Sequence, residues 1–176
     1  MKKAPIVYLN GVTSTGKTSI VEALREIGAT DFYYLSDDIF EDHIVYMDQE
    51  FGSEGYWKKL SEAVFLMHRT ARLLSDQGKA VVIDSMLLEL PAFRPHYAQV
   101  AQIYRDSPLY LVEVFCPLEI CRQRNLARGD RHEYQSQEQA EVMAKEVCYH
   151  LRLDTSLLSP EQCAREICDR IPLMHK

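Results

Sequence analysis

Residues 11–18 have the composition and spacing of a loop that binds phosphate. They read Gly-Val-Thr-Ser-Thr-Gly-Lys-Thr, which matches the pattern G-x-x-x-x-G-K-[ST] at every fixed position. Small residues let the backbone curl so that successive N–H groups point at a polyphosphate, and a helix beginning near Lys17 adds the positive end of its dipole. Lys17 can reach the β- and γ-phosphates, and the Thr18 hydroxyl can bind Mg²⁺. We therefore expect ATP and Mg²⁺ to bind here, with the nucleotide held by Gly11, Val12, Thr13, Ser14, Thr15, Gly16, Lys17, Thr18 and Ser19.

Three carboxylates follow predicted strands and can do acid–base or metal chemistry. Asp37 and Asp38 come after an apolar run at 32–35, and Asp84 ends another at 80–83. A carboxylate at that position can accept the proton of a hydroxyl group or hold Mg²⁺ through water. We interpret Asp37 as the base and Asp38 as an acceptor-binding residue. One of this pair is also expected to be a helix N-cap, so the pattern leaves open which of the two is the base. Asp84 serves either the metal or the acceptor.

Four arginines lie within ten residues, at positions 122, 124, 128 and 131. Guanidinium groups suit the charge that spreads over a phosphoryl group during transfer. Gly129 interrupts the predicted helix among them and allows a hinge. We interpret residues 122–135 as a small arginine-rich lid, with Arg128 and Arg131 as catalytic residues and Arg124 beside the nucleotide. The alternative is a solvated basic helix face.

These features favour a kinase over a GTPase. The guanine-reading sequence N-K-x-D is absent from the chain. Small-molecule kinases need an acid near the acceptor hydroxyl and mobile cations over the phosphates, and both are present here as candidates.

Composition limits the possible partners. The 176-residue chain has a formal net charge of -6, which makes non-specific binding to nucleic acid or to an anionic membrane a poor interpretation. The five cysteines form no CxxC pair, so we expect reduced, buried thiols. We found no signal peptide or membrane span, and we expect a cytoplasmic protein that is a monomer or a homodimer.

Alternating strands and helices predict how these residues are brought together. Strands are expected at 4–9, 32–35, 80–83, 109–115 and 151–154, and helices at 18–27, from about 39, and at 56–75, 91–104, 118–127, 135–150 and 160–170. This alternation predicts one domain over residues 1–176, with a mostly parallel sheet of about five strands between two layers of helices. Right-handed crossovers then place the carboxyl ends of all strands, and the candidate residues, at one edge.

Several segments, in order along nearly the whole chain, resemble the chloramphenicol phosphotransferase family of P-loop kinases. They are Val7-Tyr8-Leu9-Asn10-Gly11, Ser36-Asp37, Val82-Ile83-Asp84, Arg124 with Ala127-Arg128-Gly129-Asp130-Arg131, and Leu153-Asp154-Thr155 followed by Glu161-Gln162-Cys163-Ala164. The resemblance implies the three-layer P-loop NTPase fold and ATP-dependent phosphorylation of a hydroxyl group. It also implies that Asp37 is the general base and that the Asp154-Thr155 region, with Thr155 as a nucleotide contact, lies near the adenine.

The segment from Ile39 to Trp57 differs from the antibiotic-binding stretch expected of that family, because it is rich in aromatic and acidic residues. Aromatic rings combine apolar area with a polar handle, so we interpret 37–58 and 84–97 as acceptor-binding regions, with Phe40 and Tyr56 among the contacts. The alternative is that these rings belong to the core. For the whole chain we keep two other hypotheses, a nucleotide-dependent regulatory protein and a nucleoside or metabolite kinase.

Overall fold

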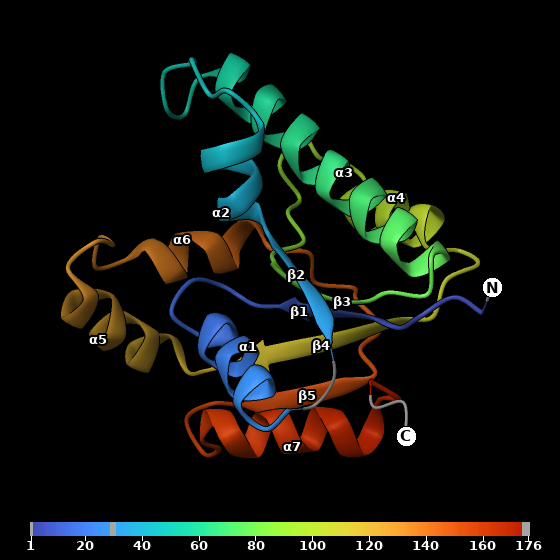
Figure 1. Cartoon of the computed structure of the whole chain (residues 1–176). Helices are drawn as coiled ribbons and strands as arrows, with labels where there is room; N and C mark the ends of the chain where they lie inside the picture. The colour runs from blue at the N-terminus through green and yellow to red at the C-terminus, as the bar shows by residue number, and fades with distance from the viewer. Residues whose placement is uncertain (1, 29–30, 174–176) are drawn as a thin grey trace.

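The computed structural model describes residues 2–28 and 31–173, which form a parallel five-stranded sheet between two layers of helices (Figure 1). The strands are β1 (Ile6–Asn10), β2 (Phe32–Ser36), β3 (Ala80–Ser85), β4 (Leu109–Phe115) and β5 (Leu151–Asp154). They lie in the order β2-β3-β1-β4-β5. The predicted α/β fold with five parallel strands is confirmed.

The two central strands are buried on both faces. Every residue of β1 and β3 is buried, in line with their nearly continuous apolar sequence. Their register pairs Asn10 with Ser85, and β2 pairs Ser36 with Asp84. The ends of β1, β2 and β3 thus lie side by side at the carboxyl edge of the sheet. The segments that follow these strands, including the phosphate loop after β1 and Asp37 after β2, begin at that edge.

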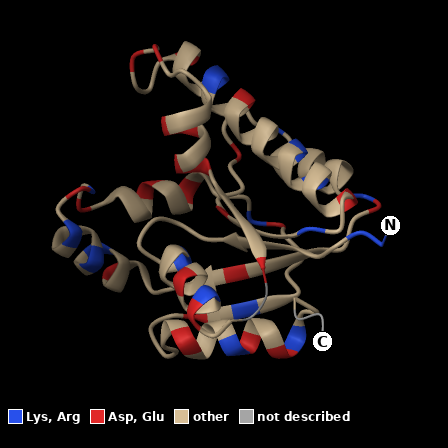
Figure 2. Cartoon of the chain, in the orientation of Figure 1, with Lys and Arg blue, Asp and Glu red and all other residues tan. Residues whose placement is uncertain are grey.

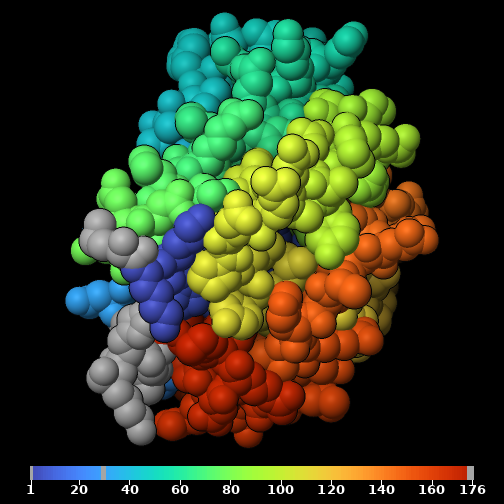
Figure 3. Space-filling model, turned by 90° about the vertical axis from the view of Figure 1, so that its right-hand side faces the viewer, coloured from blue at the N-terminus to red at the C-terminus, as the bar shows by residue number. Residues whose placement is uncertain are grey.

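Helices cover the two faces separately. On one face lie α1 (Lys17–Glu26) and α7 (Pro160–Arg170), which pack through Ile20, Leu24 and Ile167. On the other lie α3 (Glu54–Asp76) and α4 (His96–Ile103), with a second core that contains Phe65, Val100 and Tyr104. Figure 3, which views the edge opposite the phosphate loop, shows the green residues of α3 at one end of the molecule and the red residues of α7 at the other.

Four short elements stand at the carboxyl edge. They are α2 (Asp37–Ile39), the π-helical turn η1 (Phe40–Ile44), α5 (Leu118–Arg128) and α6 (Gln135–Val142). Gly129 ends α5 with a positive φ of 75°, a conformation that glycine adopts without steric cost. The predicted helix break at this residue is confirmed.

Two predicted helices are longer than the observed ones. Residues 91–94 form turns, and α4 begins only after Pro95, whose backbone is extended. The helix predicted at 135–150 ends at Val142, because the backbone beyond it pairs with another segment: Ala144 N–H donates to Leu87 O at 2.8 Å and Glu89 N–H to Val142 O at 2.7 Å. A tertiary contact therefore overrides the local helical preference.

The cysteine prediction is correct in part. All five thiols are free, and Cys116, Cys121 and Cys163 are buried, but Cys148 is exposed and Cys168 is partly buried. The described helices include none that is both long and apolar enough to cross a membrane.

Candidate active site

A cavity of about 920 Å³ opens at the carboxyl edge of the sheet, at the upper end of the size range of small-molecule sites. Its wall contains the phosphate loop, four residues of the α2–η1 segment, the end of β3, and parts of α5 and α6. The topology thus brings the loop, the three predicted carboxylates and the predicted lid to a single cavity.

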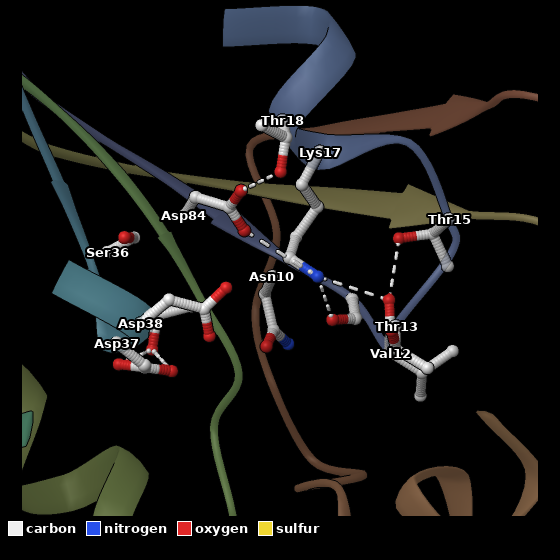
Figure 4. Close-up of polar contacts among 12 residues, drawn as sticks. Asn10, Val12, Thr13, Thr15, Lys17, Thr18, Ser36, Asp37, Asp38 and Asp84 are labelled. Atoms are coloured by element: carbon white, nitrogen blue, oxygen red, sulfur yellow. Dashed lines mark hydrogen bonds and ion pairs between the residues drawn. The ribbon is translucent and has the colours of Figure 1, made fainter. Parts of the chain in front are cut away.

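The phosphate loop holds its lysine ready at its own backbone. Lys17 Nζ donates to Gly11 O at 2.7 Å and to Val12 O at 3.1 Å, and lies 3.6 Å from Asp84 Oδ1 (Figure 4). The loop carbonyls and Asp84 therefore hold the ammonium group of Lys17 beside the loop.

Backbone geometry explains the two fixed glycines of the motif. A Cβ at Gly11 would collide with the backbone carbonyl of Val114, and Gly16 has a φ of 95°, which L side chains rarely adopt. Of the predicted loop residues, Val12 and Thr15 are buried and absent from the cavity wall. Gly11, Thr13, Ser14, Gly16, Lys17, Thr18 and Ser19 all line the cavity.

Thr18 and Asp84 form the part of the site that fits a magnesium ion. Thr18 Oγ1 donates to Asp84 Oδ2 at 2.8 Å, and the Tyr34 hydroxyl approaches the same oxygen at 3.5 Å. A hydroxyl and a carboxylate are hard oxygen donors, which Mg²⁺ prefers, and Mg²⁺ commonly uses one or two protein ligands together with nucleotide phosphates. Within the described residues no group of three or more His, Cys, Asp or Glu side chains could hold a metal by itself. These two residues therefore fit Mg²⁺ only together with phosphate oxygens and water.

Asp37 lies partly buried in the cavity wall, where Ser85 contacts both of its carboxylate oxygens. The Ser85 Oγ lies 2.8 and 2.7 Å from Oδ1 and Oδ2 of Asp37, and it also accepts a hydrogen bond from the Tyr8 hydroxyl at 3.0 Å. A serine hydroxyl has one proton. Because Tyr8 donates to Ser85, Ser85 is free to donate its own proton to Asp37.

Burial is the main cause that raises the pKa of Asp37, to about 7. That value also includes a lowering by the hydrogen bond from Ser85 and the charge of Lys17, and a raising by the negative charges of Asp84 and Asp38. A carboxylate with a pKa near neutrality is suited to accept and release a proton at physiological pH.

The sequence prediction that Asp37 or Asp38 caps a helix is wrong, because Ser36 is the N-cap. Its side chain accepts from the Ile39 N–H at 3.2 Å, and both aspartates follow in the first turn of α2. Neither carboxylate is used for capping. Asp38 is instead exposed at the cavity wall, with one oxygen 3.8 Å from Arg131.

The four predicted arginines separate into two groups. Arg124, Arg128 and Arg131 line the cavity, whereas Arg122 is outside it, in ion pairs with Glu119 and Glu133. Arg122 is therefore not part of the cavity wall, in contrast to the interpretation of all four as one lid. Helical geometry explains this, because residues 122 and 124 point to different sides of α5.

Arg124 links the phosphate loop to the segment after β5. Its guanidinium group donates to Ser14 O at 3.2 Å, to Thr155 Oγ1 at 3.1 Å and to Thr155 O at 2.9 Å. Thr155 Oγ1 in turn donates to Thr15 O at 2.7 Å. The structure thus places both of these predicted nucleotide contacts next to the loop.

The sequence did not predict three further polar residues that contact the phosphate loop, namely Asn125 of α5 and Ser136 and Gln139 of α6. Ser14 Oγ donates to Asn125 Oδ1 at 2.6 Å, Thr13 N–H donates to Gln139 Oε1 at 2.6 Å, and Ser136 Oγ donates to Thr13 O at 3.1 Å. Asn125 is fully buried, which is unusual for an amide side chain in a helix. These residues are isolated amides and hydroxyls with no motif, so the sequence offered no signal for them.

The aromatic residues divide between core and cavity. Phe40 is 5% exposed within the core under α3 and does not line the cavity, so its predicted contact with an acceptor is not supported by its position. Tyr56 lines the cavity and is joined there by Trp57 and Phe51. The Tyr56 hydroxyl donates a short hydrogen bond to Glu41.

Comparison with known proteins identifies the chain's relatives. The family model described as "Chloramphenicol phosphotransferase-like protein" matches residues 4–172, which confirms the resemblance indicated by the motifs. A protein of Mycobacterium tuberculosis strain H37Rv is 23% identical over 95% of this chain and 82% of its own length. Its name describes it, provisionally, as an O-phosphotransferase.

Solved structures of kinases share the fold. The APS kinase of Mycobacterium tuberculosis, solved with AMPPNP and APS, superposes with a TM-score of 0.71 at 19% identity and covers 98% of this chain and 99% of its own. A gluconokinase from Sinorhizobium meliloti 1021 gives a TM-score of 0.62 at 16% identity, with 97% and 93% coverage. At these identities the similarity shows the fold alone.

Proposed function

The chain belongs to the chloramphenicol phosphotransferase-like family, and we propose that it transfers the γ-phosphoryl group of ATP to a hydroxyl group of a small molecule. The observation that carries this proposal is that the phosphate loop and the Asp37 carboxyl group line the same cavity. A nucleotide-binding loop alone would fit many proteins. A carboxyl group with a pKa of about 7 in the same cavity is suited to accept the proton of an acceptor hydroxyl group.

In this proposal the phosphate loop binds and orients the nucleotide. Lys17 leaves Gly11 O and Val12 O and turns to the β- and γ-phosphates, whose negative charge is the stronger partner. Thr18 and Asp84 would hold Mg²⁺, which neutralises phosphate charge when bound. Arg124 and Thr155 lie beside the loop and would contact the nucleotide, with Thr155 near the adenine.

Asp37 accepts the proton of the acceptor hydroxyl as the new bond forms. The acceptor oxygen attacks the γ-phosphorus, the bond from that phosphorus to the bridging oxygen breaks, and ADP leaves with the electron pair. Ser85 fixes the carboxylate through its hydrogen bond, so that Asp37 remains oriented toward the cavity. Arg128 and Arg131 belong to the cavity wall and can move over the transferring group, because Asp130 and Asp38, their present partners, are exposed.

The test is a radiolabel-transfer assay with γ-labelled ATP and a library of hydroxylated metabolites and antibiotics. Asp37→Asn should lower transfer by roughly 10²–10⁴-fold, the usual contribution of a general base, and should leave the dissociation constant of ATP within about twofold. Asp106→Asn is the matched control, because Asp106 is an exposed residue in the turn after α4, away from the cavity.

Two results would contradict the proposal. Normal transfer by Asp37→Asn would exclude this residue as the base. Nucleotide binding by the parent protein, with no phosphorylated product from any library member, would favour the regulatory hypothesis instead.

A further inference from the structure

The cavity wall is divided by charge. On the side of the phosphate loop and α5 it contains Lys17, Arg124 and Arg128, with Asp84 beside Lys17. On the side of α2 and η1 it contains Asp37, Asp38, Glu41 and Asp42, with Arg131 beside Asp38. In Figure 2, α5 carries blue residues together with red, whereas α2 and the turn that follows carry red residues. The basic side matches a polyphosphate, so the acidic side is left for the other reactant.

The carboxylates of the acidic side have few positive partners. Among the described residues, Arg131 is the only arginine or lysine paired with any of these four, and its distance from Asp38 is 3.8 Å. Glu41 accepts from the neutral Tyr56 hydroxyl. Glu41 and Asp42 follow Asp38 at spacings of three and four residues, which places all three on the same side of a helical segment. Their charges therefore add within one region of the wall.

Besides burial, the same carboxylates raise the pKa of Tyr56. Burial raises the pKa of this phenol, and the hydrogen bond to Glu41 and the charges of Glu41, Asp42 and Asp38 raise it further. A field that opposes ionisation of a phenol favours a cation at the same place.

An aromatic cluster adjoins these carboxylates. The ring centroids of Phe51 and Tyr56 are 4.9 Å apart, and those of Tyr56 and Trp57 are 5.1 Å apart at an interplanar angle of 78°. All three rings line the cavity. Aromatic faces attract organic cations, and they do so more strongly where water is partly excluded.

From this wall we infer that the acceptor carries a positive charge: it is an amino alcohol, an amino sugar or a quaternary ammonium alcohol. Its hydroxyl group meets Asp37, while its cationic group lies between the carboxylates of Glu41 and Asp42 and the rings of Tyr56 and Trp57. The inference rests on the proposed function for the hydroxyl group, but the charge preference can be measured separately from transfer.

Trp57 makes that measurement direct, because it is the single tryptophan of the chain and belongs to the cavity wall. Its fluorescence can be followed while the protein, loaded with Mg²⁺ and a non-hydrolysable ATP analogue, is titrated with matched probes. The pairs are choline and 3,3-dimethylbutan-1-ol, glucosamine and N-acetylglucosamine, and kanamycin and the form in which all of its amino groups are acetylated. Each pair keeps hydroxyl groups while one member loses the charge.

We expect at least one cationic probe to bind about tenfold more tightly than its neutral partner. The double variant Glu41→Gln/Asp42→Asn should reduce that preference to about twofold or less. Glu62→Gln, which removes one negative charge from an exposed position of α3 outside the cavity, should leave it unchanged. The preference should also weaken as salt is raised, because these carboxylates are partly or fully exposed.

The inference is overturned if neutral probes bind as well as their cationic partners, if no cationic probe changes the fluorescence of Trp57, or if the double variant retains the full preference. Failure of the charge preference can be distinguished from failure of the proposed kinase function. Tight binding of cations without any phosphoryl transfer would support the charge preference and contradict the kinase assignment.

Discussion

The two sides of the cavity differ in how completely their polar groups are satisfied. On the nucleotide side, Lys17, Thr18 and Arg124 all have partners within the protein. On the acceptor side, Asp38 has one long ion pair and Asp37 is held mainly by a serine hydroxyl. The nucleotide side is thus preorganised for a ligand that many proteins bind, whereas the acceptor side keeps charges that are left for a specific ligand to satisfy.

The largest expected effect comes from the preorganised side. Lys17→Ala removes the cation that sits at Gly11 O and Val12 O, and loss of a charged group that stabilises the transferring phosphoryl group typically lowers the rate by roughly 10²–10³-fold. Steady-state kinetics should show this loss, and calorimetry should show weaker binding of Mg²⁺-ATP. Unchanged nucleotide binding and rate would mean that the loop is not the phosphate site.

A smaller effect on the rate is expected from Ser85, which forms a hydrogen bond with the proposed base Asp37. Ser85→Ala removes the hydrogen bond that lowers the pKa of Asp37. The pKa should then rise above about 7, so the acidic limb of the kcat/KM profile should move to higher pH, with a loss of up to about tenfold at pH 6.

Ser85→Thr is the control for this change, because it keeps the hydroxyl group and should restore the parent profile. A shift of the limb to lower pH, or no shift, would contradict the role given to Ser85. Because Tyr8 is fully buried and loses its acceptor in the alanine variant, stability should be measured beside the kinetics.

The smallest effect is on the free energy of unfolding, which the buried charge of Asp37 on the acceptor side should lower. The pKa of Asp37 in the folded protein, about 7, is above the ordinary value of 3.8. The stabilising contribution of its protonated form is therefore complete below pH 3.8 and is lost as pH rises through about 7. Asp37→Asn has no such loss. We therefore compare the free energy of unfolding of Asp37→Asn with that of the parent. After a discount for the partial solvent exposure of residue 37, this difference should grow by about 1–2 kcal/mol in favour of the variant between pH 5 and pH 8.

Urea unfolding of both proteins at pH 5 and pH 8 measures this difference. Asp106→Asn serves as the control, since its exposed carboxylate should give no comparable change between the two pH values. A variant that became less stable than the parent at pH 8 would show that the Asp37 charge is stabilised by the fold, and the comparison between the two sides would have to be reversed.

Much of the nucleotide side could be predicted because its chemistry is local. The phosphate-binding groups lie within eight consecutive residues, 11–18, and the glycines are required by backbone geometry that the sequence encodes directly. The parallel sheet and the position of Asp37, Asp38 and Asp84 at one edge followed from alternating apolar runs, since parallel strands share a carboxyl edge. The five-stranded parallel sheet confirms that reasoning.

The tertiary structure alone decided which side chains meet across that edge. The hydrogen bond from Tyr8 to Ser85 joins residues 77 positions apart, and the one from Thr13 to Gln139 joins residues 126 apart. The same holds for the early end of α6, the outward position of Arg122 and the burial of Phe40. Such contacts depend on strand register and helix rotation, in which a shift of a single residue exchanges the inner for the outer side, and no motif in the chain specifies them.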